Sequence, residues 1–419
     1  ADFAVRSTMI EQQVTRLGKK AGGHAVIDPA LLELVTALVE KPQAVLGSFD
    51  PAFLNVPQEA LVSSMRDHQK YFHVVDAKGA LLPAFITVSN IRSRTPARVR
   101  TGNERVLNAR LADAKFFWET DATRPLSART EALKNVLFHH ALGSLAGKTR
   151  RIEKLSAKIA QAVGAPAAAC VRAASLCKAD LVSGMVGEFP DLQGIMGRYL
   201  ARHDGEPAAV ARAIEEHYLP RHAGGALPQS PAGQVLALAD RLDSLVGLFI
   251  AGEEPTGEKD PYGLRRAALG VIRILVEKKL DLNVAALVED AADGYASDGL
   301  VSGESAKSQC TTFILERYRA LYTTLGFAQD EISAVLEAGA SRPLDFDRRL
   351  KAVSRFRHHR DAPSLTAANK RIRNILRKSE ESIPAQIDAQ QLTESAEIAL
   401  SQAILKTAGA IAQAIAKGD

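Results

Sequence analysis

The sequence predicts a mostly α-helical protein of several domains, with one small α/β domain at its N-terminal end. The length of 419 residues favours two to four domains over one. Residues up to about 127 alternate between helical and strand patterns, whereas apolar residues beyond that point recur at helical spacing. We therefore expect a mixed α/β domain at 1–127, a helical domain at 128–252, a linker and helical connection at 253–304, and a further helical domain at 305–419.

The N-terminal region carries a local signal for each of its elements. Aspartate favours the N-cap of a helix, proline its first turn, and glycine the reversal of a hairpin. The expected elements are a helix from Asp28-Pro29 to Leu38, a strand in 42–49, a helix in 57–68, two strands joined near Gly79, and a long helix from Thr95-Pro96.

Seven cations lie on the long helix or just before it, and we expect acids to pair with them on the helix surface. The acids are Glu104, Asp113 and Glu119. The cations are Arg92, Arg94, Arg98, Arg100, Arg105, Arg110 and Lys115.

A segment near the middle of the chain predicts a tight helical corner. Gly187 is expected to end its first helix, and Phe189-Pro190-Asp191 to open the second. The apolar residues of the first helix recur at steps of three and four and are Cys170, Ala174, Cys177, Leu181 and Met185.

The later part of the chain is also predicted to be helical. A helix over 234–250 carries Asp240 and Asp243, and Asp260-Pro261 is expected to cap and start the next helix. Beyond 305, loops are expected near Gly326 and at 339–343.

The composition of the chain indicates the cellular compartment in which we expect the protein. The chain is 46% hydrophobic but has no apolar run of membrane-spanning length and no signal-peptide pattern, so we expect a cytoplasmic protein without a membrane contact. Its three cysteines have no CxxC spacing, which argues against a disulfide framework and a zinc site.

The strongest functional signal is a basic segment from 348 to 378, in which eleven cations face a single acid, Asp361. Fixed cations neutralise phosphates, so a nucleic acid is the favoured partner, and a solvated helix face is the alternative. Apolar residues at helical intervals predict helices packed on one face, and these are Leu350, Val353, Phe356, Ile372 and Ile375. The cations are Arg348, Arg349, Lys351, Arg355, Arg357, Arg360, Lys370, Arg371, Arg373, Arg377 and Lys378.

Two weaker candidate sites remain open. Lys259, Arg265 and Arg266 would present cations beside a helix N-terminus, although a capped helix with exposed arginines explains them equally well. The second candidate is a metal site. Two expectations argue against it: His139 and His140 should point in different directions on a helix, and His203-Asp204 should lie in a loop. It would combine His139-His140, His203-Asp204 and Asp240. There is no phosphate-binding GxxxxGK[ST] loop or GxSxG elbow, so no active site is recognisable.

The helical corner resembles the one at which HD-superfamily phosphohydrolases hold a metal with a His-Asp pair. The aligned pair here is Cys177-Lys178, and Asp240 matches the late aspartate of that metal set. A lysine ammonium has no lone pair and repels a cation. The resemblance therefore implies an HD-like scaffold that has lost its metal.

The chain as a whole resembles the beta subunit of the bacterial tetrameric glycyl-tRNA synthetase. The words that carry this resemblance are GNERVLNARLADAKFF, LGSLAGKTRRI, GEFPDLQGIMGRY, EHYLPRHAG, LADRLDSLVGLF and TGEKDPYGLRRAALG. It implies an α2β2 enzyme that uses ATP to join glycine to tRNA(Gly), with the adenylation site on the alpha subunit. It also implies an HD-like middle domain and a truncated anticodon-binding-like C-terminal region, with no cofactor and no catalytic residue on this chain.

Two other functions are kept as alternatives. One is a metal-dependent HD-type phosphohydrolase acting on nucleotides, which would need a divalent metal held by Asp240. The other is a general RNA-binding protein, which would show no preference among tRNAs and would bind no alpha subunit.

Overall fold

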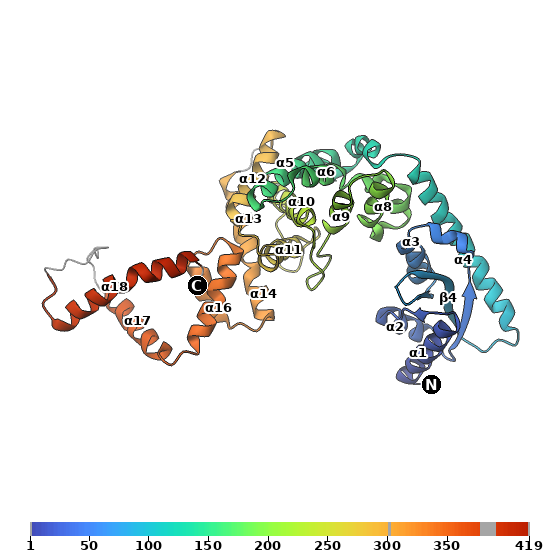
Figure 1. Cartoon of the computed structure of the whole chain (residues 1–419), viewed down its shortest axis with the longest axis horizontal. Coiled ribbons are helices and arrows are strands. Elements are labelled where there is room, and N and C mark those ends of the chain that lie inside the picture. The colour runs from blue at the N-terminus through green and yellow to red at the C-terminus, as the bar shows by residue number, and fades with distance from the viewer. Residues whose placement is uncertain (1, 301–302, 378–390, 418–419) are drawn as a thin grey trace. The chain divides into compact units, whose positions relative to one another are not determined.

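The computed structural model describes residues 2–300, 303–377 and 391–417 (Figure 1). The chain divides into two compact units, one of residues 1–251 with 291–301 and one of residues 252–290 with 302–419. The finer division into four domains stays a prediction. None of the described helices is both long enough and apolar enough to cross a membrane.

The N-terminal part of the first unit is an antiparallel sheet with the strand order β1-β3-β4-β2, covered on both faces by helices. The turn between β3 and β4 contains Gly79 at φ +82°, as the hairpin signal predicts. Its elements are α1 (Phe3–Lys20), β1 (His24–Ala25), α2 (Pro29–Leu38), β2 (Gln43–Ser48), η1 (Pro51–Asn55), α3 (Gln58–Ser63), η2 (Ser64–His68), β3 (Phe72–Val75), β4 (Leu81–Ser89) and α4 (Pro96–Ala122).

The two faces of this sheet have separate cores. Phe72 and Ile86 pack against α1 and α2, whereas Phe85 packs on the opposite face against α4. Side chains alternate between faces along a strand, so adjacent Phe85 and Ile86 enter different cores. The α/β character and the helix starts at Pro29 and Pro96 agree with the sequence analysis.

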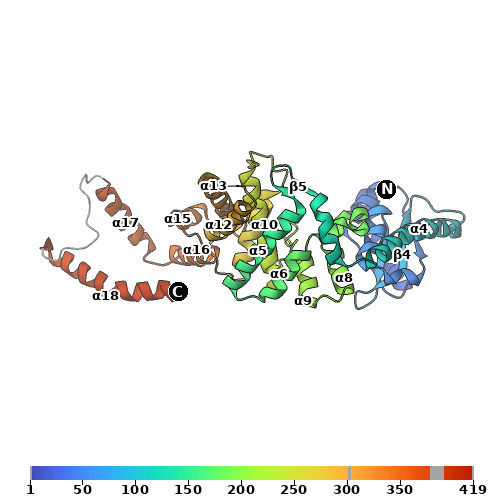
Figure 2. The same ribbon diagram turned by 90° about the horizontal axis from the view of Figure 1, so that it is seen from above.

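The rest of the first unit is a helical bundle in which α5, α6, α9 and α10 pack together (Figure 1, Figure 2). Asp121 near the end of α4 accepts hydrogen bonds from the Gly184 and Met185 amides at 3.0 and 2.8 Å, which fixes α4 on this bundle. The elements are η3 (Leu126–Asn135), β5 (Leu137–His139), β6 (Gly143–Ser144), α5 (Leu145–Val163), α6 (Ala167–Leu176), η4 (Ala179–Val182), α7 (Gly184–Glu188), η5 (Pro190–Leu192), α8 (Ile195–His203), α9 (Ala208–Glu216) and α10 (Pro231–Ile250).

The prediction of one helix from Cys170 through Met185 is wrong, because α6 ends at Leu176 and the chain turns before α7. Polar side chains cause the break. The Asp180 carboxylate accepts hydrogen bonds from the Gly194 and Gly197 amides at 2.6 and 3.0 Å, at the start of α8. The Ser183 hydroxyl accepts the amide hydrogen of Val186 and caps α7.

The helical placement of His139 and His140 is also wrong. His139 is the last residue of strand β5 and His140 follows it, and β5 pairs with β6 in a short hairpin in which His139 lies opposite Gly143, φ +86°. Their rings lie 4.1 Å apart rather than pointing apart.

In its described part the second unit consists of helices, apart from an isolated antiparallel bridge between Thr256 and Lys259. Asp260 bonds the Leu264 and Arg265 amides as expected of a cap, but Gly263 at φ +66° occupies the N-cap and α11 begins at Leu264 rather than at Pro261. The elements are α11 (Leu264–Glu277), α12 (Val284–Ser297, shared with the first unit), α13 (Glu304–Leu315), α14 (Arg317–Thr324), α15 (Gln329–Glu337), α16 (Pro343–Arg357), α17 (Ala362–Leu376) and α18 (Ser395–Lys417).

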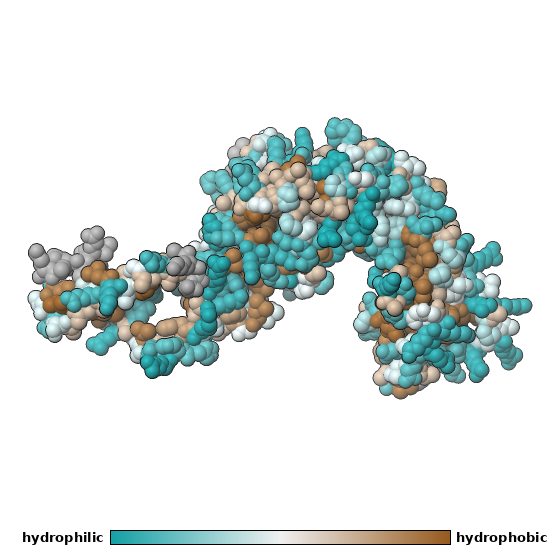
Figure 3. Space-filling view, in the orientation of Figure 1, coloured by the Kyte–Doolittle hydropathy of each residue, from teal (hydrophilic) through white to brown (hydrophobic). Residues whose placement is uncertain are grey.

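The core of this unit lies between α14 and α16, where the Tyr318 and Phe346 rings stack 3.9 Å apart. The packed face predicted for the basic segment is present only in part of α16, because Leu350 is fully buried whereas Phe356 is 45% exposed. It is absent in α17, where Ile372 is 53% and Ile375 60% exposed. Figure 3 shows such hydrophobic side chains at the surface of the C-terminal helices.

Candidate functional site

A buried cluster of charged residues lies in the bundle of the first unit, where the chain turns after α6. Lys178, 4% exposed, places its ammonium 3.0 Å from Oδ2 of Asp240 and 2.9 Å from Nε2 of His217. The ammonium also lies 4.3 Å from the centre of the Tyr218 ring. The turn after Cys177 presents Lys178, α10 presents Asp240, and the end of α9 presents the histidine.

The cluster continues along α5 and α10. Lys148 Nζ lies 3.1 Å from Asp240 and 3.1 Å from Asp243. Arg151 donates from Nε to Asp243 at 2.7 Å and from Nη1 to Asp298, directly after α12, at 2.9 Å. Three cations thus face three carboxylates, so the cluster is electrically balanced without any further ion.

The protonation states follow from this geometry. Burial alone would raise the pKa of Asp240, but the ammonium groups of Lys148 and Lys178 outweigh it and hold that pKa well below its usual value. Burial and the Lys178 charge hold the pKa of His217 well below its usual range. The neutral ring then donates from Nδ1 to the Ile214 carbonyl at 2.6 Å and accepts from Lys178 at Nε2.

This arrangement argues against metal-dependent chemistry at the predicted HD-like positions. A carboxylate and a neutral histidine nitrogen are good metal ligands, but here the Lys178 ammonium fills the space between them. Burial raises the pKa of the Cys177 thiol to about 12, so it is not a thiolate ligand. Among the described residues, no group of three or more His, Cys, Asp or Glu side chains could hold a metal ion.

Sequence reasoning identified Lys178 and Asp240 but missed most of the cluster. The missed residues are Lys148, Arg151, His217, Asp243 as a cluster member, Tyr295 and Asp298. A signal for part of it was present, because Lys148 and Arg151 lie three residues apart on an amphipathic helix, and Asp240 and Asp243 lie three residues apart on another helix. The metal set of His139, His203 and Asp240 is not assembled, since His203 contacts Trp118 and Asp204 accepts from the Leu126 amide.

The predicted basic segment lies on two helices of the second unit, the partly buried α16 and the exposed α17. Acids pair with part of α16: Arg349 with Asp345 and Lys351 with Asp347, both at 2.8 Å. Arg357 pairs with Asp330, also at 2.8 Å, and Arg360 lies 3.6 Å from Asp361. The other described cations have no carboxylate of a described residue within 4.0 Å, and these are Arg348, Arg355, Lys370, Arg371, Arg373 and Arg377. Lys378 lies outside the described residues.

The geometry around Lys259, Arg265 and Arg266 favours a capped helix with exposed arginines over a binding site. Arg265 Nη2 donates to the Gly257 carbonyl at 2.7 Å, so this arginine ties down the loop before α11. Lys259 and Arg266 are exposed. Nothing in this geometry gathers the three cations around one point.

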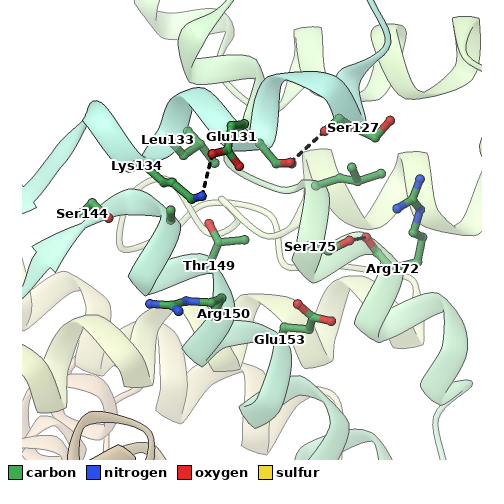
Figure 4. A pocket seen from close by; sticks show the side chains of 13 residues that line it. Ser127, Glu131, Leu133, Lys134, Ser144, Thr149, Arg150, Glu153, Arg172 and Ser175 are labelled. Carbon is green, nitrogen blue, oxygen red and sulfur yellow. Dashed lines mark hydrogen bonds and ion pairs between the residues drawn. The ribbon is translucent and has the colours of Figure 1, made fainter. Parts of the chain in front are cut away.

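A cleft of about 550 Å³ opens on the bundle between η3, α5 and α6 (Figure 4). Its lining mixes hydroxyl groups with charges of both signs, and Lys134 pairs there with Glu131 at 2.6 Å. None of the candidate site residues named from the sequence lines this cleft.

Comparison with known protein families identifies the family to which the chain belongs. Residues 1–337 match the family described as glycyl-tRNA synthetase beta subunit. The chain belongs to this family. The matched region contains the whole ionic cluster, whereas α16 and α17 lie beyond it.

Individual members of the family align with more of the chain. It is 46% identical over 419 residues to the glycine--tRNA ligase beta subunit of Pseudomonas aeruginosa (strain UCBPP-PA14), covering 100% of this chain and 61% of that protein. The same-named protein of Ectopseudomonas mendocina is 48% identical over 404 residues, covering 96% and 59%. That of Aeromonas hydrophila is 45% identical over 419 residues, covering 100% and 60%. The chain therefore spans about 60% of the length of these relatives.

Proposed function

We propose that this chain is the tRNA-binding part of the beta subunit of a glycine--tRNA ligase. In this proposal the complete enzyme joins glycine to tRNA(Gly) with ATP in the cytoplasm, and the adenylation site lies on an alpha subunit. The chain itself binds no cofactor and supplies no catalytic residue. The observation that carries the proposal is family membership over residues 1–337.

The exposed cations of α16 and α17 support a direct role in tRNA binding. Arg371 and Arg373 of α17 have no described acid nearby, so their charge is available to phosphates. We assign α16 and α17 to an anticodon-binding-like region, and Lys259, Arg265 and Arg266 to a secondary contact.

The buried cluster supports a scaffold role for the helical bundle. We propose that the bundle is an HD-like domain in which Lys178 has replaced the metal. The phosphohydrolase alternative would need Asp240 free to bind a metal, and two ammonium groups already neutralise that carboxylate.

The proposal is tested by charging tRNA(Gly) with radiolabelled glycine. Alpha subunit alone, this chain alone and their mixture are compared, with a full-length beta subunit as the positive control. Charging by the mixture alone is the expected result. If full-length beta also fails to restore charging, the proposal is refuted; if only this chain fails, the assignment holds and residues beyond this chain are needed.

The alpha subunit is also the test for the general RNA-binding alternative. That alternative predicts equal affinity for all tRNAs and no retention of alpha on the immobilised chain. Retention of alpha together with stimulation of charging would exclude it.

A further inference from the structure

A second basic surface lies in the N-terminal α/β part, far along the sequence from α16 and α17. It comes from two segments without any acid, residues 12–27 and 77–103. The first contributes Arg16, Lys19 and Lys20, and the second contributes Arg92 and the basic residues that begin α4. In Figure 3 hydrophilic side chains gather over α1 and the adjoining end of α4.

The expected ion pairs form in only part of this region. Farther along α4, Arg110 lies 4.0 Å from Asp113 and Lys115 lies 3.7 Å from Glu119, as predicted. Nearer the start of the helix, Arg100 reaches Glu104 only at 4.0 Å. The remaining cations have no described carboxylate within 4.0 Å, and these are Arg16, Lys19, Lys20, Arg92, Arg94, Arg98 and Arg105.

Three of these unpaired cations, together with Arg100, surround one groove of about 570 Å³, and no acid lines it. Arg16 and Lys20 lie one turn apart on α1, Arg92 follows β4, and Arg100 lies on α4. The outer edge of strand β2 forms part of the lining, including Leu46.

The backbone of β2 adds a donor to this groove. The Ala44 amide donates to the Gln13 side chain at 2.7 Å, and the Ser48 amide donates to Glu104 at 3.0 Å, so both point away from β4. Because amide directions alternate along a strand, the Leu46 amide also points outward, between these two bonds. Four cations and an amide donor thus face the groove, and no acidic side chain lines it, so it is suited to bind an anion.

We infer that this groove binds the phosphodiester backbone of RNA. A peptide pairing with β2 as an added strand is disfavoured, because Gln13 and Glu104 already block both ends of that edge and leave one free residue. Stacking on bases is disfavoured as well, since no aromatic side chain lines the groove. The contact should therefore be independent of sequence, and it extends the proposed tRNA-binding function to a second surface.

The test is fluorescence anisotropy of the full 419-residue chain with labelled tRNA(Gly) and with an unrelated tRNA, over a series of salt concentrations. The groove variant combines Arg16→Gln, Lys20→Gln and Arg92→Gln. The slope of log affinity against log salt is negative, and each lost phosphate contact should make it less steep by roughly 0.7 to 0.9, so three lost contacts should reduce its magnitude by roughly 2 to 3. Both tRNAs should lose affinity equally, roughly tenfold or more at low salt.

The matched control combines Arg105→Gln, Arg110→Gln and Lys115→Gln, which removes the same charge from α4 outside the groove. Fluorescence of Trp118 verifies that both variants fold. An unchanged slope in the groove variant overturns the inference, and so does an equal loss in the control. Loss of binding to a labelled polyglutamate peptide with unchanged RNA binding would also overturn it, and would make the groove a contact for an acidic protein.

A third variant separates this inference from the proposed function on which it rests. It combines Lys370→Gln, Arg371→Gln and Arg373→Gln on α17. If only this variant loses tRNA affinity, the result supports tRNA binding by the C-terminal helices and overturns the inference that the groove binds RNA. Loss in the groove variant alone supports the groove and removes the C-terminal assignment, and a wild-type chain that binds no RNA refutes both.

Discussion

Replacing Lys178 by methionine tests whether its ammonium holds the buried cluster together. Methionine keeps most of the side-chain length but removes the charge and both polar contacts, at 3.0 Å to Asp240 and 2.9 Å to His217. The cluster would keep two cations for three carboxylates. Removing one partner of a buried ion pair costs about 3 to 5 kcal/mol.

From the structure we expect the stability lost with the Lys178–Asp240 ion pair to lie toward the lower end of that range. Asp240 keeps Lys148 at 3.1 Å and is 15% exposed, so its charge is only partly uncompensated. His217 loses the donor to Nε2, which adds about 1 kcal/mol. We therefore expect the free energy of unfolding of the first unit to fall by about 4 kcal/mol.

The assay is urea unfolding followed by fluorescence of Trp118, the single tryptophan of the chain. Its ring packs 6.2 Å from that of Tyr199 in the first unit, so it reports on that unit. The control is Lys178→Met combined with Asp240→Asn, which restores two cations to two carboxylates and should recover about half of the loss. A single variant within about 0.5 kcal/mol of wild type, or a double variant less stable than the single one, would refute the reasoning.

Three further changes probe the same region. Burial raises the pKa of Asp180 to about 6, above its unfolded value of 3.8, so the folded state binds the proton more tightly and stability falls as pH rises from about 4 to 6. Asp180→Asn should abolish this decline, worth on the order of 3 kcal/mol, in unfolding curves measured at pH 4 and pH 7; an unchanged pH profile would contradict it. Gly194→Ala should cost at least about 1 kcal/mol in the same assay, because Gly194 has φ +82° and a Cβ there would lie 2.5 Å from the Tyr218 ring; wild-type stability would contradict this. Lys178→Asp would leave four carboxylates for two cations, so Zn²⁺ should raise its melting temperature and not that of wild type, whereas an equal response of both would contradict the charge count.

Local chemistry made much of the fold predictable. The starts of α2 and α4 follow from proline in the first helical turn, and the hairpin follows from Gly79 between two β-rich runs. Each of these signals acts within a few residues. The break after α6 was not predictable in this way, because it depends on Asp180 reaching amides 14 and 17 residues later.

The candidate site shows the same division. The sequence indicated that Lys178 disables a metal site, since that follows from the chemistry of one side chain. It did not indicate that His217 would accept from this lysine, because the two are 39 residues apart and only tertiary packing brings them together. The apolar residues of α17 looked like a packed face by periodicity, yet Ile372 and Ile375 are exposed. Periodicity identifies an apolar stripe without telling what covers it.

Salt should separate the two kinds of charge in this protein. The cluster around Lys178 is buried, and Lys148 is 3% exposed, so mobile ions screen these pairs weakly. The cations of α17 and of the groove beside β2 are exposed and should release counterions when they meet phosphates. Raising salt from about 0.05 to 0.5 M should therefore weaken RNA binding by orders of magnitude while the Trp118 unfolding midpoint changes little. If the midpoint fell in parallel with binding, the cluster would be open to solvent, and the proposal that it is a buried replacement for a metal would have to be abandoned.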